Sequence, residues 1–152
     1  MSFVGNFAAA RAYKANAKFN KGLFDLQAKL EKAKTEQNRA IYNNLDRPRL
    51  VKKQDAEYDF LFVRALKSGA EIREGESPYL ALLEAGVNQA TDLAIADFNS
   101  RQAYFDGINQ SLLTAFKGEG EMFKGRVLAQ SEMIKGIATA GGNYASTQSL
   151  LG

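Results

Sequence analysis

The chain has 152 residues, a length typical of one domain, and its 45% hydrophobic and 24% charged residues are typical of a folded rather than a disordered chain. It contains no cysteine and no histidine, which excludes disulfides, thiolate nucleophiles, zinc sites of the usual Cys/His kind and histidine acid–base chemistry. Its net charge of +3 conceals a balance of +8 in residues 1–53 and −5 in residues 54–152. This polarity favours head-to-tail packing of identical subunits, or contact between the first helix and an anionic partner.

Residues 1–12 are mostly small and apolar, and we predict a loosely ordered N-terminus or a short contact segment there. A basic helix is predicted over 13–44, because apolar side chains recur at alternating steps of four and three residues from Phe19 onward. The Asp46-Arg47-Pro48 segment predicts a turn that ends this helix.

A second helix is predicted over 50–68, where Tyr58, Leu61 and Leu66 share one face and Gly69 follows the last turn. The acidic connection after it contains Glu74 and Gly75. It leads to Ser77 and Pro78, which predict an N-cap followed by proline at the first helical position.

From Pro78 an apolar stripe continues at helical spacing, so a single helix is predicted over 78–116. About 38 residues at 1.5 Å each give a rod of roughly 57 Å, whereas a compact chain of this size has a radius of gyration of about 15 Å. We therefore predict an all-α fold, an elongated helical hairpin or bundle forming one domain over 1–152.

Residues 117–152 contain seven of the chain's 13 glycines. We expect a hinge at Gly118-Glu119-Gly120, then a flexible, Gly-rich segment with a short helix near 122–137 that ends at Gly141-Gly142.

A rod of this length indicates that part of its apolar surface packs against other subunits. The residues predicted to form this subunit interface are Leu23, Leu26, Leu30, Leu83, Val87, Phe98, Arg101, Phe105 and Ile108. Arg101 lies on the apolar stripe four residues after Asp97, a spacing that also predicts an ion pair within the helix.

Basic residues recur at helical spacing in the first helix. Arg11, Lys14, Lys18 and Lys21 form either a surface that attracts DNA phosphates without reading bases, or the solvated face of a coiled coil. Both interpretations fit the spacing.

Carboxylates are the only catalytic candidates. Glu71, Glu74 and Glu76 precede the long helix, and Glu119 and Glu121 flank a glycine. Neither set adjoins an apolar or aromatic substrate site in the sequence, so we interpret them as solvated charges and predict no enzymatic activity, cofactor or metal. No basic leader and no apolar run of roughly 18 residues is present, so we expect a soluble product without a secretory signal.

Several short segments resemble one known family. They are Arg64-Ala65-Leu66, Glu74-Gly75-Glu76-Ser77, Leu80, Asn88, Asp97 and the run Arg101 to Phe105. Together with the preceding Ala/Gln/Lys-rich helix, they resemble the middle of the internal core proteins of short-tailed phages (podoviruses), and the resemblance covers about residues 15–115. The chain departs from that pattern in being short, and in lacking a strongly apolar N-terminal segment and a basic C-terminal tail.

The resemblance implies a virion protein located inside the capsid near the portal. It implies copies arranged in a ring with other internal virion proteins and with portal or tail proteins. It also implies release at infection to help form the conduit (ejectosome) that carries the genome across the host envelope, with contact to the host outer membrane. One alternative is a portal or tail channel plug that stays with the tail, and another is a carboxylate-dependent wall hydrolase.

Overall fold

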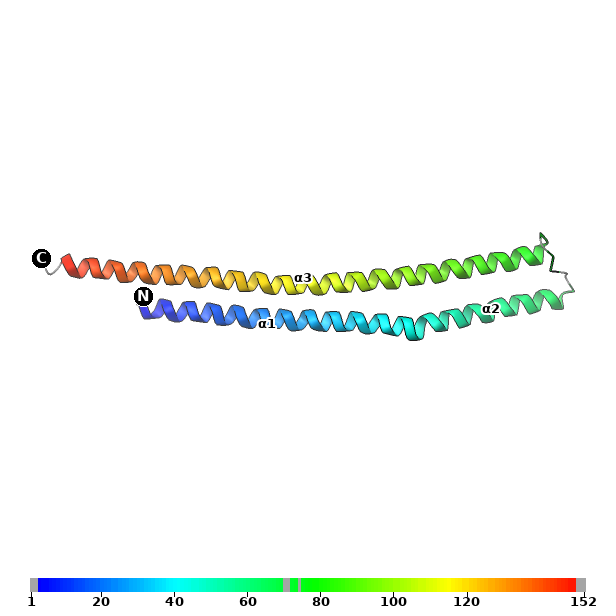
Figure 1. Ribbon diagram of the computed structural model, residues 1–152, viewed down its shortest axis with the longest axis horizontal. Helices are drawn as coiled ribbons and strands as arrows, with labels where there is room; N and C mark the ends of the chain where they lie inside the picture. The colour runs from blue at the N-terminus through cyan, green and yellow to red at the C-terminus, as the bar shows by residue number, and fades with distance from the viewer. Residues whose placement is uncertain (1–2, 70–71, 74, 150–152) are drawn as a thin grey trace. The chain divides into compact units, whose positions relative to one another are not determined.

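The computed structural model describes residues 3–69, 72–73 and 75–149, and no strand occurs among them. Helix α1 spans Phe3–Ile41, a π-helical turn follows at Tyr42–Asp46, α2 spans Arg47–Lys67, and α3 spans Ser77–Ser149 (Figure 1). The 73 residues of α3 correspond to roughly 110 Å of helical rise. The predictions of an all-α fold and of one very long helix are confirmed.

The predicted loose order is wrong over the described part of 1–12, because α1 begins at Phe3 rather than near residue 13. Alanine, the best helix former, occurs at positions 8, 9 and 10. Tertiary packing adds to this propensity, because Asn6 and Ala10 are buried.

The predicted turn at residues 46–48 is also wrong, because the chain stays helical through it. The helix widens by one π-helical turn at Tyr42–Asp46, and the N–H of Arg47 donates to the carbonyl of Tyr42. Pro48 then lies in the first turn of α2, not before it. A proline ring clashes with the carbonyl four residues earlier, and the wider turn relieves that crowding without ending the helix.

The connection between α2 and α3 agrees with the glycine signals. Helix α2 ends at Lys67 with Ser68 as its C-cap, and Gly69 adopts φ +71°, the left-handed conformation of many helix ends. Gly75 adopts φ +86° just before α3. The carbonyl of Glu76 accepts the N–H of Leu80, so the cap lies one residue before the predicted Ser77. The predicted loop residue Glu74 lies outside the described residues.

Helix α3 does not end near residue 116, and the predicted hinge at residues 118–120 and the predicted helix end at Gly141-Gly142 are wrong. The helix is continuous to Ser149. Glycine lowers helix propensity by about 1 kcal/mol relative to alanine, but Gly118, Gly125 and Gly136 are buried. Their lack of a side chain permits a close helix contact, and this contact offsets the low propensity.

The contacts divide the chain into two compact units, unit 1 with residues 1–32 and 109–152, and unit 2 with residues 33–108. That the whole chain acts as one domain stays a prediction. In unit 1, the first part of α1 packs antiparallel to the last part of α3, since Lys21 contacts Glu119 and Glu31 contacts Thr114.

Small side chains fill the contact in unit 1. We call this contact the inner seam, which comprises Ala10, Ala17 and Ala28 of α1 with Ser111, Thr114, Gly118, Gly125 and Ala129 of α3. A Cβ atom added at Gly125 would collide with the Cβ of Ala17, and one added at Gly118 would lie 3.0 Å from the Cβ of Phe24. The two helices therefore approach closely, because glycine and alanine let them.

In unit 2, the end of α1 and all of α2 pack antiparallel to the first part of α3. The side-chain amide of Gln54 donates to the carbonyl of Gln89 at 2.9 Å, and that of Gln89 donates to the carbonyl of Gln54 at 2.8 Å. Gln54 and Leu82 are buried. These reciprocal bonds fix the register of α2 against α3, since a shift of either helix would break both.

We predict opposite effects of alanine at two glycines of α3. Gly125→Ala adds a methyl group where Ala17 leaves no room, so we expect a loss of about 1–3 kcal/mol in unfolding free energy. Gly120→Ala faces open space, so we expect a gain of about 0.5–1 kcal/mol. Urea denaturation followed by circular dichroism measures both, and equal effects would contradict the close contact.

Candidate functional site

The largest side chains of unit 1 lie on its surface. Exposed large hydrophobic residues on α1 include Phe19, Leu23, Leu26 and Leu30. Those on α3 include Leu112, Phe116, Phe123, Val127, Ile134 and Ile137. Phe116 and Phe123 are each 70% exposed, so neither contributes much to packing within the unit.

These exposed residues form one continuous stripe on each helix. At about 100° per residue, the six α3 residues lie within a narrow sector, roughly 150° around the axis from the inner seam. The α1 residues Phe19 to Leu30 lie at a similar angle from Ala17 and Ala28. We call these two sets the outer stripes of unit 1. Each helix thus places small residues inward and large residues outward, the reverse of a self-sufficient core.

Unit 2 has a comparable apolar surface. On α3 the exposed large residues include Leu80, Leu83, Val87, Ile95, Phe98 and Phe105, and on α2 they include Phe60, Leu61, Phe62, Val63 and Leu66. A shallow groove of about 530 Å³ on α3 runs from Val87 to Phe98 and is lined otherwise by Ala90, Thr91, Ala94 and Ile95. This surface is accessible to a partner helix.

The residues predicted as a subunit interface lie on these surfaces. Of the nine, only Ile108 is half-buried, and the other eight, from Leu23 to Phe105, are exposed. They do not form the contact between helices within either unit. Their role at a subunit interface stays a prediction.

The inner seam was missed because the sequence was examined for large apolar residues. Its signal is small residues at steps of three, four and seven, as at Ser111, Thr114, Gly118, Gly125 and Ala129. Of the two glycines among them, Gly118 falls in the predicted hinge, although its spacing from the others equally fits one face of a helix.

A polar cluster in unit 2 joins Asp97 of α3 to the π-helical turn and α2. The hydroxyl of Tyr42 donates to Asp97 Oδ1 at 2.8 Å, and Arg47 Nε donates to the same oxygen at 3.0 Å. Arg47 and then Tyr42 hold the pKa of Asp97 below its ordinary value, and the charge of Arg101 adds to this. The predicted pairing with Arg101 is therefore replaced by a bond to Arg47.

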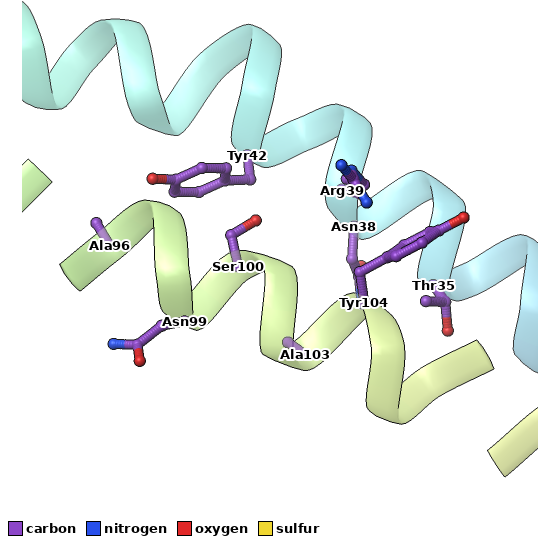
Figure 2. A pocket seen from close by; sticks show the side chains of 9 residues that line it. All are labelled: Thr35, Asn38, Arg39, Tyr42, Ala96, Asn99, Ser100, Ala103 and Tyr104. Carbon is purple, nitrogen blue, oxygen red and sulfur yellow. The ribbon is translucent and has the colours of Figure 1, made fainter. Parts of the chain in front are cut away.

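Tyr42 also borders a groove of about 380 Å³ in unit 2 (Figure 2). Burial first, and then its bond to Asp97, raise the pKa of Tyr42 above 10.0. Figure 2 shows Arg39 of α1 beside the ring of Tyr104, and its guanidinium carbon lies 4.3 Å from the ring centroid. This cation–π contact joins α1 to α3 along one wall of the groove.

The basic residues predicted to face DNA differ in their surroundings. Lys21 Nζ lies 2.8 Å from Glu119 Oε1 and 2.9 Å from Asp25 Oδ2, and these bonds raise the pKa of Lys21. Arg11, Lys14 and Lys18 are exposed. Lys14 and Lys18 line a groove of about 400 Å³ in unit 1, whose other residues are Ala17, Met122, Arg126, Gln130 and Met133.

Two of the three acidic catalytic candidates that the structure describes are engaged in ion pairs, and the third, Glu76, is exposed. Glu119 pairs with Lys21, and Glu121 lies 3.9 Å from Lys124. Glu71 and Glu74 lie outside the described residues. Within the described part of the chain, no group of three or more Asp, Glu, Cys or His side chains could hold a metal ion. No helix in that part is long and apolar enough to cross a membrane.

Comparison with protein-family models, with curated proteins and with solved structures finds no match to this chain.

We predict that the bonds of Asp97 make the unfolding free energy of unit 2 fall at low pH. The pKa of Asp97 is lowered by folding, so its stabilising bonds are present above its ordinary value of 3.8 and are lost as pH falls through the lower, folded-state pKa. Asp97→Asn should therefore lower the unfolding free energy at pH 5, and the difference from wild type should shrink toward pH 2. Urea titrations at several pH values measure this difference.

The exposed Asp55 provides the matched control, because no side-chain bond to it is seen in the described structure. Asp55→Asn should change stability little at either end of the range. A difference between wild type and Asp97→Asn that stays constant from pH 5 to pH 2 would contradict the role assigned to Asp97.

Proposed function

We propose that this chain is a structural, non-enzymatic virion protein of the internal core of a short-tailed phage. In this proposal it assembles near the portal and is released at infection, when it helps to form the conduit for genome ejection across the host envelope. The resemblance of residues 15–115 supports the phage assignment. The outer stripes support the assembly.

The outer stripes are the single observation that carries the proposal. Burying a side chain such as Phe116 or Leu112 contributes about 1.5–3 kcal/mol, and apolar surfaces of this extent mark sites of interaction. The inner seam already occupies the opposite face of each helix. A further helix packed on the stripes would therefore complete the core that the units lack.

Other copies of the chain are the first partners we propose for these surfaces. Unit 1 carries ten Lys/Arg and five Asp/Glu, a balance of +5, and unit 2 carries ten and twelve, a balance of −2. Opposite charge on the two units favours contact between unit 1 of one copy and unit 2 of the next, as in a ring of head-to-tail subunits. Other internal virion, portal or tail proteins are proposed to contact the same ring.

An alternative is a portal or tail channel plug. Helical subunits with outward apolar stripes suit a gate as well as a core. The two differ in fate, because a core protein leaves at infection and a plug remains attached to the tail.

We predict that the protein is present in purified phage particles and absent after ejection. Quantitative mass spectrometry of particles before and after receptor-triggered ejection measures both, with the portal protein as the retained control. Retention at full copy number would favour the plug, and absence from intact particles would contradict both proposals.

We also predict that the outer stripe of α3 drives self-association. Phe116→Ser with Phe123→Ser removes two exposed rings, and at about 1.5–3 kcal/mol each the association constant should fall at least about a hundredfold. Sedimentation velocity of the full chain measures the shift toward monomer.

The control replaces two exposed polar residues of the same helix, Gln110→Ser and Lys117→Ser. It should leave self-association within a few-fold of wild type. Circular dichroism checks that both double variants remain helical. Equal association of wild type and the Phe116/Phe123 variant would contradict an interface on the outer stripe.

A further inference from the structure

The positive charge of unit 1 is unevenly neutralised. Each of its five carboxylate side chains contacts a donor: Asp25 and Glu119 share Lys21, Glu31 accepts from Thr114, Glu121 lies near Lys124, and Glu132 pairs with Lys135. None of these pairings uses Lys14, Lys18 or Arg126. The excess charge of the unit therefore lies partly on these three side chains.

The fold brings these three cations to one groove. Lys14 and Lys18 lie one turn apart on α1, and Arg126 reaches the groove from α3, 108 residues after Lys18 in the chain. Ala17, Met122 and Met133 line the groove between them, and no carboxylate is among its lining residues. From spacing alone Lys21 would belong to this set, but in the structure it is neutralised, and Arg126 takes its place.

We propose that this groove, with Lys14, Lys18 and Arg126 as its cations, binds the phosphate backbone of duplex DNA without reading its sequence. Arg11 extends the row on α1, and Arg11 to Lys18 spans about 10 Å of helix axis. Duplex DNA presents roughly six phosphate charges over that length, one per about 1.7 Å. The three cations of α1 and Arg126 of α3 can therefore each face a phosphate along such a length of duplex.

The groove favours duplex DNA over single strands and over membranes. None of its lining residues is aromatic, so it has no ring on which an unpaired base could stack. Around α1, Lys18 lies about 100° and Lys14 about 140° from Phe19. A lipid surface that buried the outer stripe of α1 would therefore leave these lysines at its margin or facing away from it, although Arg126 lies beside the outer stripe of α3.

The inference deepens the proposed function, because it names the genome as the partner of unit 1. Its test uses purified full-length protein, so it succeeds or fails independently of whether the chain occurs in particles. A chain found in virions that does not bind duplex DNA would end this inference and leave the proposed function standing.

The experiment measures fluorescence anisotropy of a labelled, mixed-sequence duplex of about 30 base pairs as salt is raised. The groove variant combines Lys14→Gln, Lys18→Gln and Arg126→Gln. Each lost phosphate contact lowers the slope of log K against log salt by about 0.9, so the slope should be shallower than that of wild type by about 2.7.

The matched control combines Lys21→Gln, Lys124→Gln and Lys135→Gln, which changes the net charge of the same unit equally. Its slope should change by less than about 1, because these lysines already face carboxylates. Circular dichroism melting checks that both variants fold. Equal losses in the two variants would show that binding follows net charge alone, and would overturn the proposal.

Two further probes distinguish other partners. A single strand of the same length should bind more weakly than the duplex. Vesicles of phosphatidylcholine with phosphatidylserine should bind no more weakly to the groove variant than to its control. Groove-dependent vesicle binding without duplex binding, or a preference for the single strand, would also overturn the proposal.

Discussion

Close contact between helices determines most other features of this protein. In unit 1, α1 and α3 approach over glycine, alanine, serine and threonine, and a methyl group added at Gly125 would collide with Ala17. Such a contact leaves little room for large side chains between the helices, where Phe24 alone among the large apolar residues of α1 lies beside a seam glycine. The other large apolar side chains must therefore lie elsewhere, and a two-helix unit has no second layer to cover them. Their exposure is a consequence of the close contact.

Polar contacts then select one alignment of the helices. A seam of small residues is similar along its length, so it specifies register poorly. The reciprocal bonds of Gln54 and Gln89, and the bonds of Asp97 to Tyr42 and Arg47, are each possible in only one alignment of unit 2. The π-helical turn belongs to the same arrangement, because Tyr42 lies within it and bonds across to α3.

The sequence predicted the helical class, the long third helix and its start near Pro78, because these depend on local spacing and capping. Prediction from the sequence failed where contacts between helices override the local conformational preference of a residue. Gly118 and Gly120 indicated a hinge, but Gly118 is buried in the inner seam. The proline at position 48 indicated a break, but one wide turn accommodates it. The apolar stripe predicted for packing between subunits is exposed and lies away from the helix contact within each unit, and its role at a subunit interface stays a prediction.

The candidate site shows the same division. Helical spacing identified Lys14, Lys18 and Lys21 as one basic face, yet spacing cannot show that Glu119, nearly a hundred residues later, neutralises Lys21. Nor could it show that Arg126 joins the other two. The sequence shows which charges lie along a single helix. The fold must be known before one can tell which of these charges remain after ion pairing with another helix.

On α1 the outer stripe and the groove lysines lie on different sides of the helix, whereas on α3 Arg126 lies at the margin of the outer stripe. If copies bury the stripe of α1, Lys14 and Lys18 stay open to solvent. Three phosphate contacts on a single subunit bind weakly at physiological salt, but a ring presents the same groove many times, and linked weak sites add up to substantial attraction. Contacts that read no sequence and exchange rapidly also let a strand slide past them. In the proposed ring, such grooves would therefore attract the genome without preventing its exit.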